Sequence, residues 1–137
     1  MASGIYIVAL KNEAPISSYS GDQRRQHLGT PVMRGDLKFG KSTNLTRRQR
    51  NYERTFGAEN IEFKIVIETK SIDTLEASIK QRVANYRIVG INGRRLEWLR
   101  GLNFSALEEI VINTANITDD IARLTTVLKD FGGVNER

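Results

Sequence analysis

The chain has 137 residues, of which 39% are hydrophobic and 27% charged, with no cysteine and a formal net charge of +5. This length suits one globular domain with its own core, and the absence of cysteine excludes disulfides and thiolate metal sites. No apolar run approaches the ~20 residues of a membrane span, and no signal-peptide pattern is evident. We therefore expect an intracellular protein with no membrane partner, acting in the cytoplasm or nucleoid, or in the nucleus if it comes from a eukaryote or its virus.

The first third of the chain predicts two strands joined by a long loop. Residues 3–10 are β-branched and aromatic, which is typical of a buried strand. Residues 11–34 contain both prolines and show no periodicity, so we expect a loop there. A second short strand is expected at about 36–42.

The middle of the chain predicts a helix, a strand and another helix. Asn44 is a suitable N-cap for a helix over about residues 45–56. The alternating segment 62–68 predicts a strand, and Ser71 is a suitable cap for a second helix over about 72–86.

The last third predicts irregular structure followed by helices. Residues 87–102 show no clear period, whereas 105–114 and 117–131 have helical spacing, the latter ending at Gly132-Gly133.

These elements predict one domain of the α/β (α+β) class, spanning residues 1–137. We expect a small antiparallel or mixed three-stranded sheet flanked by helices within a core of residues 3–100. Residues 101–137 would form a helical extension.

Positive charge is concentrated in one window. Residues 34–54 hold seven basic and two acidic residues, whereas the chain from Gly101 onward holds three basic and six acidic ones. A clustered basic patch is the electrostatic footprint of a protein that binds a phosphate backbone, such as that of DNA. A solubilising charged helix is the alternative that charge alone leaves open.

Two charged residues interrupt the predicted apolar faces. Arg48 shares the inward stripe of the first helix with Leu45 and Tyr52, and Glu76 lies at the edge of the buried stripe of the second helix. A partly buried charge is costly unless it is paired or faces a cleft. Arg48 and Glu76 therefore either form a structural salt bridge or contribute to a site.

A set of short motifs follows the predicted elements in order. The motifs are Gly4-Ile5-Tyr6, Lys38-Phe39-Gly40, Gly40-Lys41-x-x-Asn44-Leu45-x-x-Arg48-x-x-x-Tyr52, Leu75-Glu76 and Arg95-Leu96-Glu97-Trp98. With this set the sequence resembles the GIY-YIG endonuclease superfamily over roughly residues 3–100. The middle motif is similar to the nuclease domain of the excision-repair endonuclease, and the last looks like a segment of phage and large-virus members. Lys38 stands where the family has its second tyrosine.

The resemblance implies a metal-dependent DNA endonuclease that hydrolyses phosphodiester bonds by a one-metal mechanism. It implies that Tyr6 activates water, Arg48 holds the scissile phosphate and Glu76 binds Mg²⁺ or Mn²⁺. Each role suits the residue: a guanidinium offers bidentate donors to phosphate, and a lone carboxylate suits a water-rich ion. Because a phenol has a pKa of about 10, we expect Lys38 to lower the pKa of Tyr6 through its positive charge.

Further residues are candidates around this catalytic set. Additional substrate contacts are expected from Lys41, Asn44, Arg47 and Tyr52. Glu97 is either a second metal ligand or the ion-pair partner of Arg94 or Arg95, and Trp98 is expected in the core.

The sequence is also compatible with other functions. The chain could be a catalytically inactive DNA-binding module on the same fold, or a protein-interaction domain that docks through its acidic C-terminal helices. Those helices could also form a homodimer. In the long loop, Arg24 and Arg25 are candidates for DNA contact, and His27 is expected to be solvated.

Overall fold

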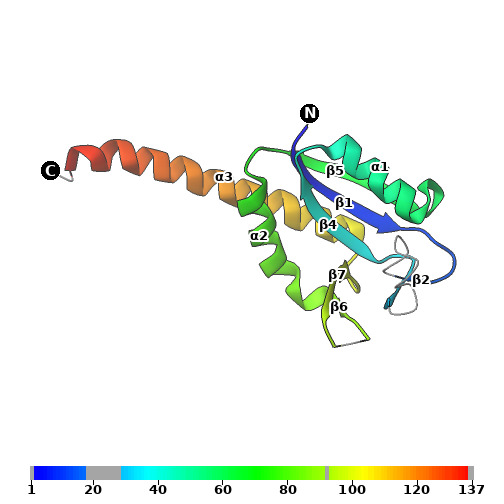
Figure 1. The fold of residues 1–137 in the computed structure, drawn as a ribbon. Helices are drawn as coiled ribbons and strands as arrows, with labels where there is room; N and C mark the ends of the chain where they lie inside the picture. Colours follow the sequence, from blue (N-terminus) through cyan, green and yellow to red (C-terminus); the bar gives the residue numbers. More distant parts are fainter. Residues whose placement is uncertain (1, 18–28, 92, 136–137) are drawn as a thin grey trace.

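Helices pack on both faces of one antiparallel sheet in the computed structural model of the chain (Figure 1). The structure describes residues 2–17, 29–91 and 93–135, with side chains up to residue 119. Arg24, Arg25 and His27 lie outside the described residues. None of the described helices combines the length and the apolar character that crossing a bilayer requires.

The main sheet has the strand order β5-β1-β4-β7-β6. Its strands are β1 (Gly4–Leu10), β4 (Leu37–Ser42), β5 (Ile61–Glu68), β6 (Arg87–Val89) and β7 (Arg95–Leu99). The predicted α+β class is confirmed, but the described sheet has five strands where three were expected.

Both segments predicted to lack regular structure contain short strands. In the predicted loop, β2 (Ile16–Ser17) pairs with β3 (Pro31–Val32). In the predicted irregular segment, β6 and β7 form a hairpin at the sheet edge. The guanidinium of Arg87 in β6 donates to the carbonyl oxygen of Leu96 in β7 at 2.7 Å, so a side-chain hydrogen bond helps to join the two strands. Both strands are too short for an alternating hydrophobic pattern to be recognised in the sequence.

Three α-helices are described: α1 (Leu45–Phe56), α2 (Ile72–Val83) and α3 (Phe104–Asn135), with short 3₁₀ turns at Ala58–Asn60 and Ala84–Tyr86. The first helix begins and ends where the sequence predicts. Asn44 Oδ1 accepts the backbone N–H of Arg47 at 3.1 Å, and Gly57 follows the helix with a φ of 89°.

The C-terminal region is one helix where two were predicted. Helix α3 continues through residues 115–116, which were expected to separate the two helices, and through Gly132-Gly133, the expected stop. The hydroxyl of Thr114 donates to the carbonyl oxygen of Ile110 at 2.6 Å, and that of Thr118 to Thr114 at 2.8 Å. These bonds satisfy the hydroxyls within the helix, so the threonines do not break it.

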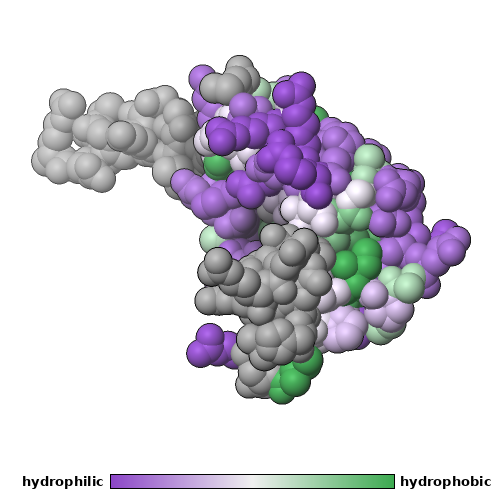
Figure 2. Space-filling view, turned by 45° about the vertical axis from the view of Figure 1, so that its right-hand side comes forward, coloured by the Kyte–Doolittle hydropathy of each residue, from purple (hydrophilic) through white to green (hydrophobic). Residues whose placement is uncertain are grey.

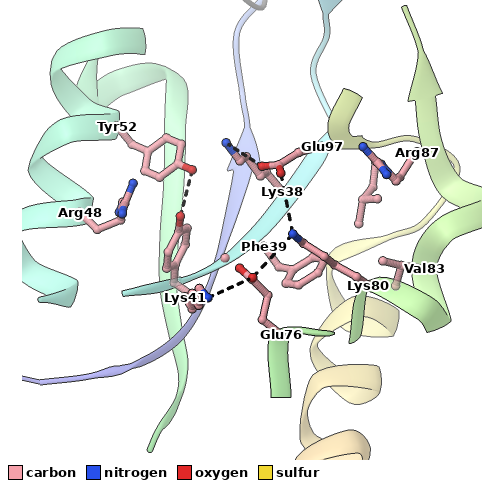
Figure 3. A pocket seen from close by; sticks show the side chains of 13 residues that line it. Lys38, Phe39, Lys41, Arg48, Tyr52, Glu76, Lys80, Val83, Arg87 and Glu97 are labelled. Carbon is pink, nitrogen blue, oxygen red and sulfur yellow. Dashed lines mark hydrogen bonds and ion pairs between the residues drawn. The ribbon is translucent and has the colours of Figure 1, made fainter. Parts of the chain in front are cut away.

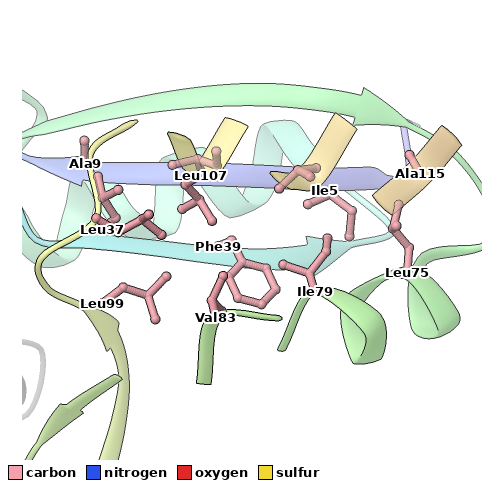
Figure 4. Packing of buried hydrophobic residues seen from close by; sticks show 13 residues of the cluster. Ile5, Ala9, Leu37, Phe39, Leu75, Ile79, Val83, Leu99, Leu107 and Ala115 are labelled. Carbon is pink, nitrogen blue, oxygen red and sulfur yellow. The ribbon is translucent and has the colours of Figure 1, made fainter. Parts of the chain in front are cut away.

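Strand β1, which lies between β5 and β4, is buried on both faces and divides the core into two layers. Its odd-numbered residues from Ile5 to Ala9 pack against α2 and α3 (Figure 4). Tyr6, Val8 and Leu10 point to the opposite face, where α1 contributes Leu45. Tyr6 therefore emerges from the middle of the sheet toward α1, which positions its phenol beside the helix.

Candidate active site

A cavity of about 260 Å³ opens beside β4, where the sheet splits (Figure 3). Among the described residues, strands β4 and β7 share one paired position, Leu37 with Leu99, so the two strands separate beyond it. The polar residues that line the cavity are Tyr6, Lys38, Lys41, Arg48, Tyr52, Glu76, Lys80, Arg87 and Glu97. They come from β1, β4, α1, α2, β6 and β7, so the tertiary fold assembles this cavity.

Six of the eight residues predicted from the sequence line this cavity. They are Tyr6, Lys38, Lys41, Arg48, Tyr52 and Glu76. Asn44 and Arg47 do not line it: the side chain of Asn44 caps α1, and Arg47 is exposed. Arg50 and Arg54 are exposed on the same helix. In the coloured part of the surface in Figure 2, hydrophilic residues cover the larger area and hydrophobic residues smaller ones.

The phenol of Tyr6 occupies the space above Gly40. The two residues are paired across β1 and β4, and the ring lies over the glycine. A Cβ atom at residue 40 would lie 2.7 Å from Cζ of Tyr6 and closer still to its hydroxyl oxygen. Only glycine leaves room for the phenol, so Gly40 positions Tyr6 toward the cavity.

We expect Gly40→Ala to lower the free energy of unfolding by about 1 to 3 kcal/mol, the usual cost of overpacking. Chemical denaturation checks the value. The matched control is the same substitution in a Tyr6→Leu background, where the ring is gone and the cost should shrink. An equal cost in both backgrounds would show that the ring is not the obstacle.

The two cavity tyrosines form a buried hydrogen-bonded pair. The hydroxyl oxygens of Tyr6 and Tyr52 lie 3.0 Å apart, and the side chains are 3% and 8% exposed. Burial raises the pKa of Tyr6 most, and the neighbouring Tyr52 raises it further. Lys38 and Arg48 lower it by smaller amounts, so the predicted lowering by Lys38 is outweighed and the net direction is upward. Burial also raises the pKa of Tyr52.

Lys38 lies between aromatic rings and a carboxylate. Its Nζ is 5.5 Å from the centroid of Tyr52, 5.9 Å from that of Trp98 and 3.8 Å from Oε2 of Glu97. Cation–π contact and ion pairing hold the ammonium at the cavity wall. Trp98 is buried as expected, with its ring edge-to-face with that of Phe56.

Glu97 is ion-paired differently from the sequence prediction. Its carboxylate contacts Lys38 and, at 3.9 Å, Lys80. The guanidinium of Arg95 donates to the carbonyl oxygen of Ala84 instead. Glu97 thus belongs to the charged wall of the cavity.

Glu76 faces two lysines. Its carboxylate is 17% exposed, and the Nζ atoms of Lys41 and Lys80 each lie 3.6 Å from Oε1. Lys41 also binds Asp73, and this hydrogen bond is the main reason that the pKa of Lys41 is raised.

Arg48 and Glu76 do not pair with each other. No ion pair joins them, although both line the cavity, so the structural salt bridge considered from the sequence is absent. Arg48 is also exposed where partial burial was expected. Its guanidinium reaches the cavity from α1 and is open to solvent there.

The cavity has more positive than negative charge. Five cationic side chains line it against two carboxylates: Lys38, Lys41, Arg48, Lys80 and Arg87 against Glu76 and Glu97. Such a lining attracts anions. The sequence prediction did not include Lys80 or Arg87. The spacing of Lys80 from Glu76, four residues along a helix, could have indicated it, whereas Arg87 reaches the cavity only through the tertiary fold.

The donor set restricts which metal ion the cavity could hold. In the described part of the chain, no three His, Cys, Asp or Glu side chains cluster as a metal cage. Glu76 is one half-buried carboxylate in an open cavity, and Mg²⁺ is commonly held by one or two carboxylates with water and substrate oxygens completing its shell. The residues therefore fit a water-rich ion held by Glu76, provided that Lys41 and Lys80 move away from that carboxylate.

Comparison of the chain with protein-family models, with curated proteins and with solved structures gave no match. The function proposed below therefore depends on the chemistry of the cavity together with the motif resemblance.

Proposed function

We propose that this chain is a metal-dependent endonuclease that hydrolyses phosphodiester bonds in DNA. The observation that supports it most is that a phenol, a guanidinium and a carboxylate from three different elements line one cavity: Tyr6 from β1, Arg48 from α1 and Glu76 from α2. A hydrolase of phosphodiesters needs groups of these kinds to activate water, hold the phosphate and bind a metal ion.

Arg48 is the proposed phosphate ligand. Among the described residues it has no ion pair, so its planar donors are available to phosphate oxygens. Lys38 and Lys41 contribute further positive charge from β4. The exposed Arg47 extends this charge along α1, where it can contact a neighbouring phosphate.

Tyr6 is the proposed acceptor of the proton from the attacking water. The water oxygen forms a bond to phosphorus while the bond from phosphorus to the leaving 3′ oxygen breaks, and the water proton passes to the phenolate. Mg²⁺ or Mn²⁺, when bound at Glu76, supplies positive charge that stabilises the transition state. Lys38 and Arg48 both favour the phenolate form of Tyr6 against the effect of burial.

A DNA-binding module without cleavage is the second candidate. The observations in its favour are the raised pKa of Tyr6 and the two lysines beside Glu76, since both oppose the catalytic states of these residues. Such a module would use the same cations to hold a phosphate backbone.

Nicking of supercoiled plasmid DNA, with Mg²⁺ and with excess chelator, tests the proposal. We expect cleavage only with the metal, and a loss of about 100-fold in Arg48→Ala, similar to the loss of one transition-state donor. Arg50→Ala is the matched control, because it removes an exposed arginine of the same helix from outside the cavity.

The outcomes separate the candidates. Arg48→Lys keeps the charge but loses the bidentate geometry, so it should stay impaired. Salt-dependent binding without any cleavage by the unmodified chain would contradict the endonuclease proposal and favour the binding module. Equal losses in Arg48→Ala and Arg50→Ala would contradict the role given to the cavity.

A further inference from the structure

Helix α3 extends well beyond the sheet on which it begins. It runs from Phe104 to Asn135, about 48 Å at 1.5 Å per residue, and its C-terminal half projects away from the rest of the chain (Figure 1). Its first turns pack in the core through Leu107, Val111 and Ala115, which are 0 to 3% exposed. About three turns, from Phe104 to Ala115, suffice for this packing, so the core does not explain the projecting half of the helix.

The exposure of the described side chains shows where α3 leaves the core. Ile110 packs against the core and Thr114 is 1% exposed, whereas Ile117, one turn further, is 43% exposed. The apolar face of the helix thus continues past the point where this domain covers it.

Apolar residues recur along this face of α3 with a period of seven residues. Positions separated by alternating steps of four and three residues hold Ile110, Thr114, Ile117, Ile121, Leu124, Leu128 and Phe131. We call these seven residues the α3 stripe. All but Thr114 are apolar, and a 3.5-residue period is that of a helix packed against another helix by knobs into holes.

We infer that the α3 stripe is the interface between two copies of this chain, which pair through their α3 helices as a coiled coil. The stripe is complementary to itself, because an identical helix offers holes at the same period as its own knobs. A second copy of the chain therefore supplies the partner that this spacing requires.

Charge along α3 favours a second copy over a nucleic-acid partner. The positions that flank the α3 stripe between residues 113 and 127 are Asn113, Thr118, Asp120, Thr125 and Val127. Only one is charged, so two identical helices meet with little repulsion. The chain from Gly101 onward has six acidic and three basic residues, which opposes contact with a phosphate backbone. This inference does not depend on the endonuclease activity.

Sedimentation equilibrium of the whole chain tests it. We expect a mass of twice 15.5 kDa for the unmodified chain, and 15.5 kDa for Leu124→Lys, which introduces a charge into the α3 stripe. Thr126→Lys is the matched control: it adds the same side chain to α3 outside the stripe, and the dimer should persist.

Folding is checked independently by thermal unfolding of the sheet domain. It should survive Leu124→Lys because the described core residues of α3 end at Ala115, more than two turns before residue 124. An unmodified chain that stays at 15.5 kDa up to millimolar concentration overturns the inference. So does a dimer that Leu124→Lys leaves intact, or one that Thr126→Lys disrupts equally.

Discussion

Glu76→Gln is expected to lower the rate of Mg²⁺-dependent DNA cleavage about 1000-fold. A metal ion contributes several kcal/mol to the transition state of such a reaction, and each 1.4 kcal/mol corresponds to about tenfold in rate. The neutral amide keeps the size of the side chain but loses the charge that would hold the ion. Single-turnover cleavage across a Mg²⁺ titration checks it.

Glu97→Gln is the matched control. Glu97 is the other cavity carboxylate and contacts the same Lys80, yet it is 59% exposed where Glu76 is 17% exposed. We expect it to change the rate by less than about tenfold, as for the loss of an exposed ion pair. If Glu97→Gln abolished cleavage and Glu76→Gln did not, the metal would have to be assigned to Glu97.

The sequence predicted best the elements whose determinants are local. Helix α1 begins at Leu45 because Asn44 caps it, and it ends before Gly57, whose positive φ favours glycine. Strand β1 is recognisable because every residue in it is apolar or aromatic except Gly4. Both follow from short-range chemistry.

Short strands whose pairing depends on distant contacts were not predicted. Strands β6 and β7 hold arginines that resemble a surface loop, and their pairing depends on a sheet edge formed far earlier in the chain. The long helix α3 was predicted as two helices, 105–114 and 117–131, whereas the hydroxyls of Thr114 and Thr118, on either side of the expected break, bond within one continuous helix. Propensity is a weak guide where tertiary packing decides.

The candidate site, too, was predicted in part from the sequence and in part not. Tyr6, Arg48 and Glu76 were singled out by motif, and the fold brings all three to one cavity. Lys38 lowers the pKa of Tyr6 as expected, but the net shift is upward because burial outweighs it. Phe63 stacks on the ring at 4.9 Å and Tyr52 lies against the hydroxyl. Burial of this kind arises only when strands β1 and β5 and helix α1 meet.

Tyr6→Phe is expected to abolish the pH dependence of cleavage along with most of the activity. If Tyr6 accepts the proton, it must first be ionised, and burial raises its pKa above the usual value of about 10. Below that pKa the phenolate fraction rises about tenfold for each pH unit, so the rate should climb throughout the neutral and mildly alkaline range without a plateau. Single-turnover rates measured from about pH 6 to about pH 9 check the slope of rate against pH.

One further variant changes the pKa of Tyr6 and completes the test. Lys38 lowers that pKa, so Lys38→Met should raise it and slow cleavage. In the Tyr6→Phe background Lys38→Met should not have this effect, because no phenol remains at residue 6 to titrate. A rate that still climbs with pH in Tyr6→Phe would mean that hydroxide or another base activates the water, and Tyr6 would then be a structural residue held over Gly40.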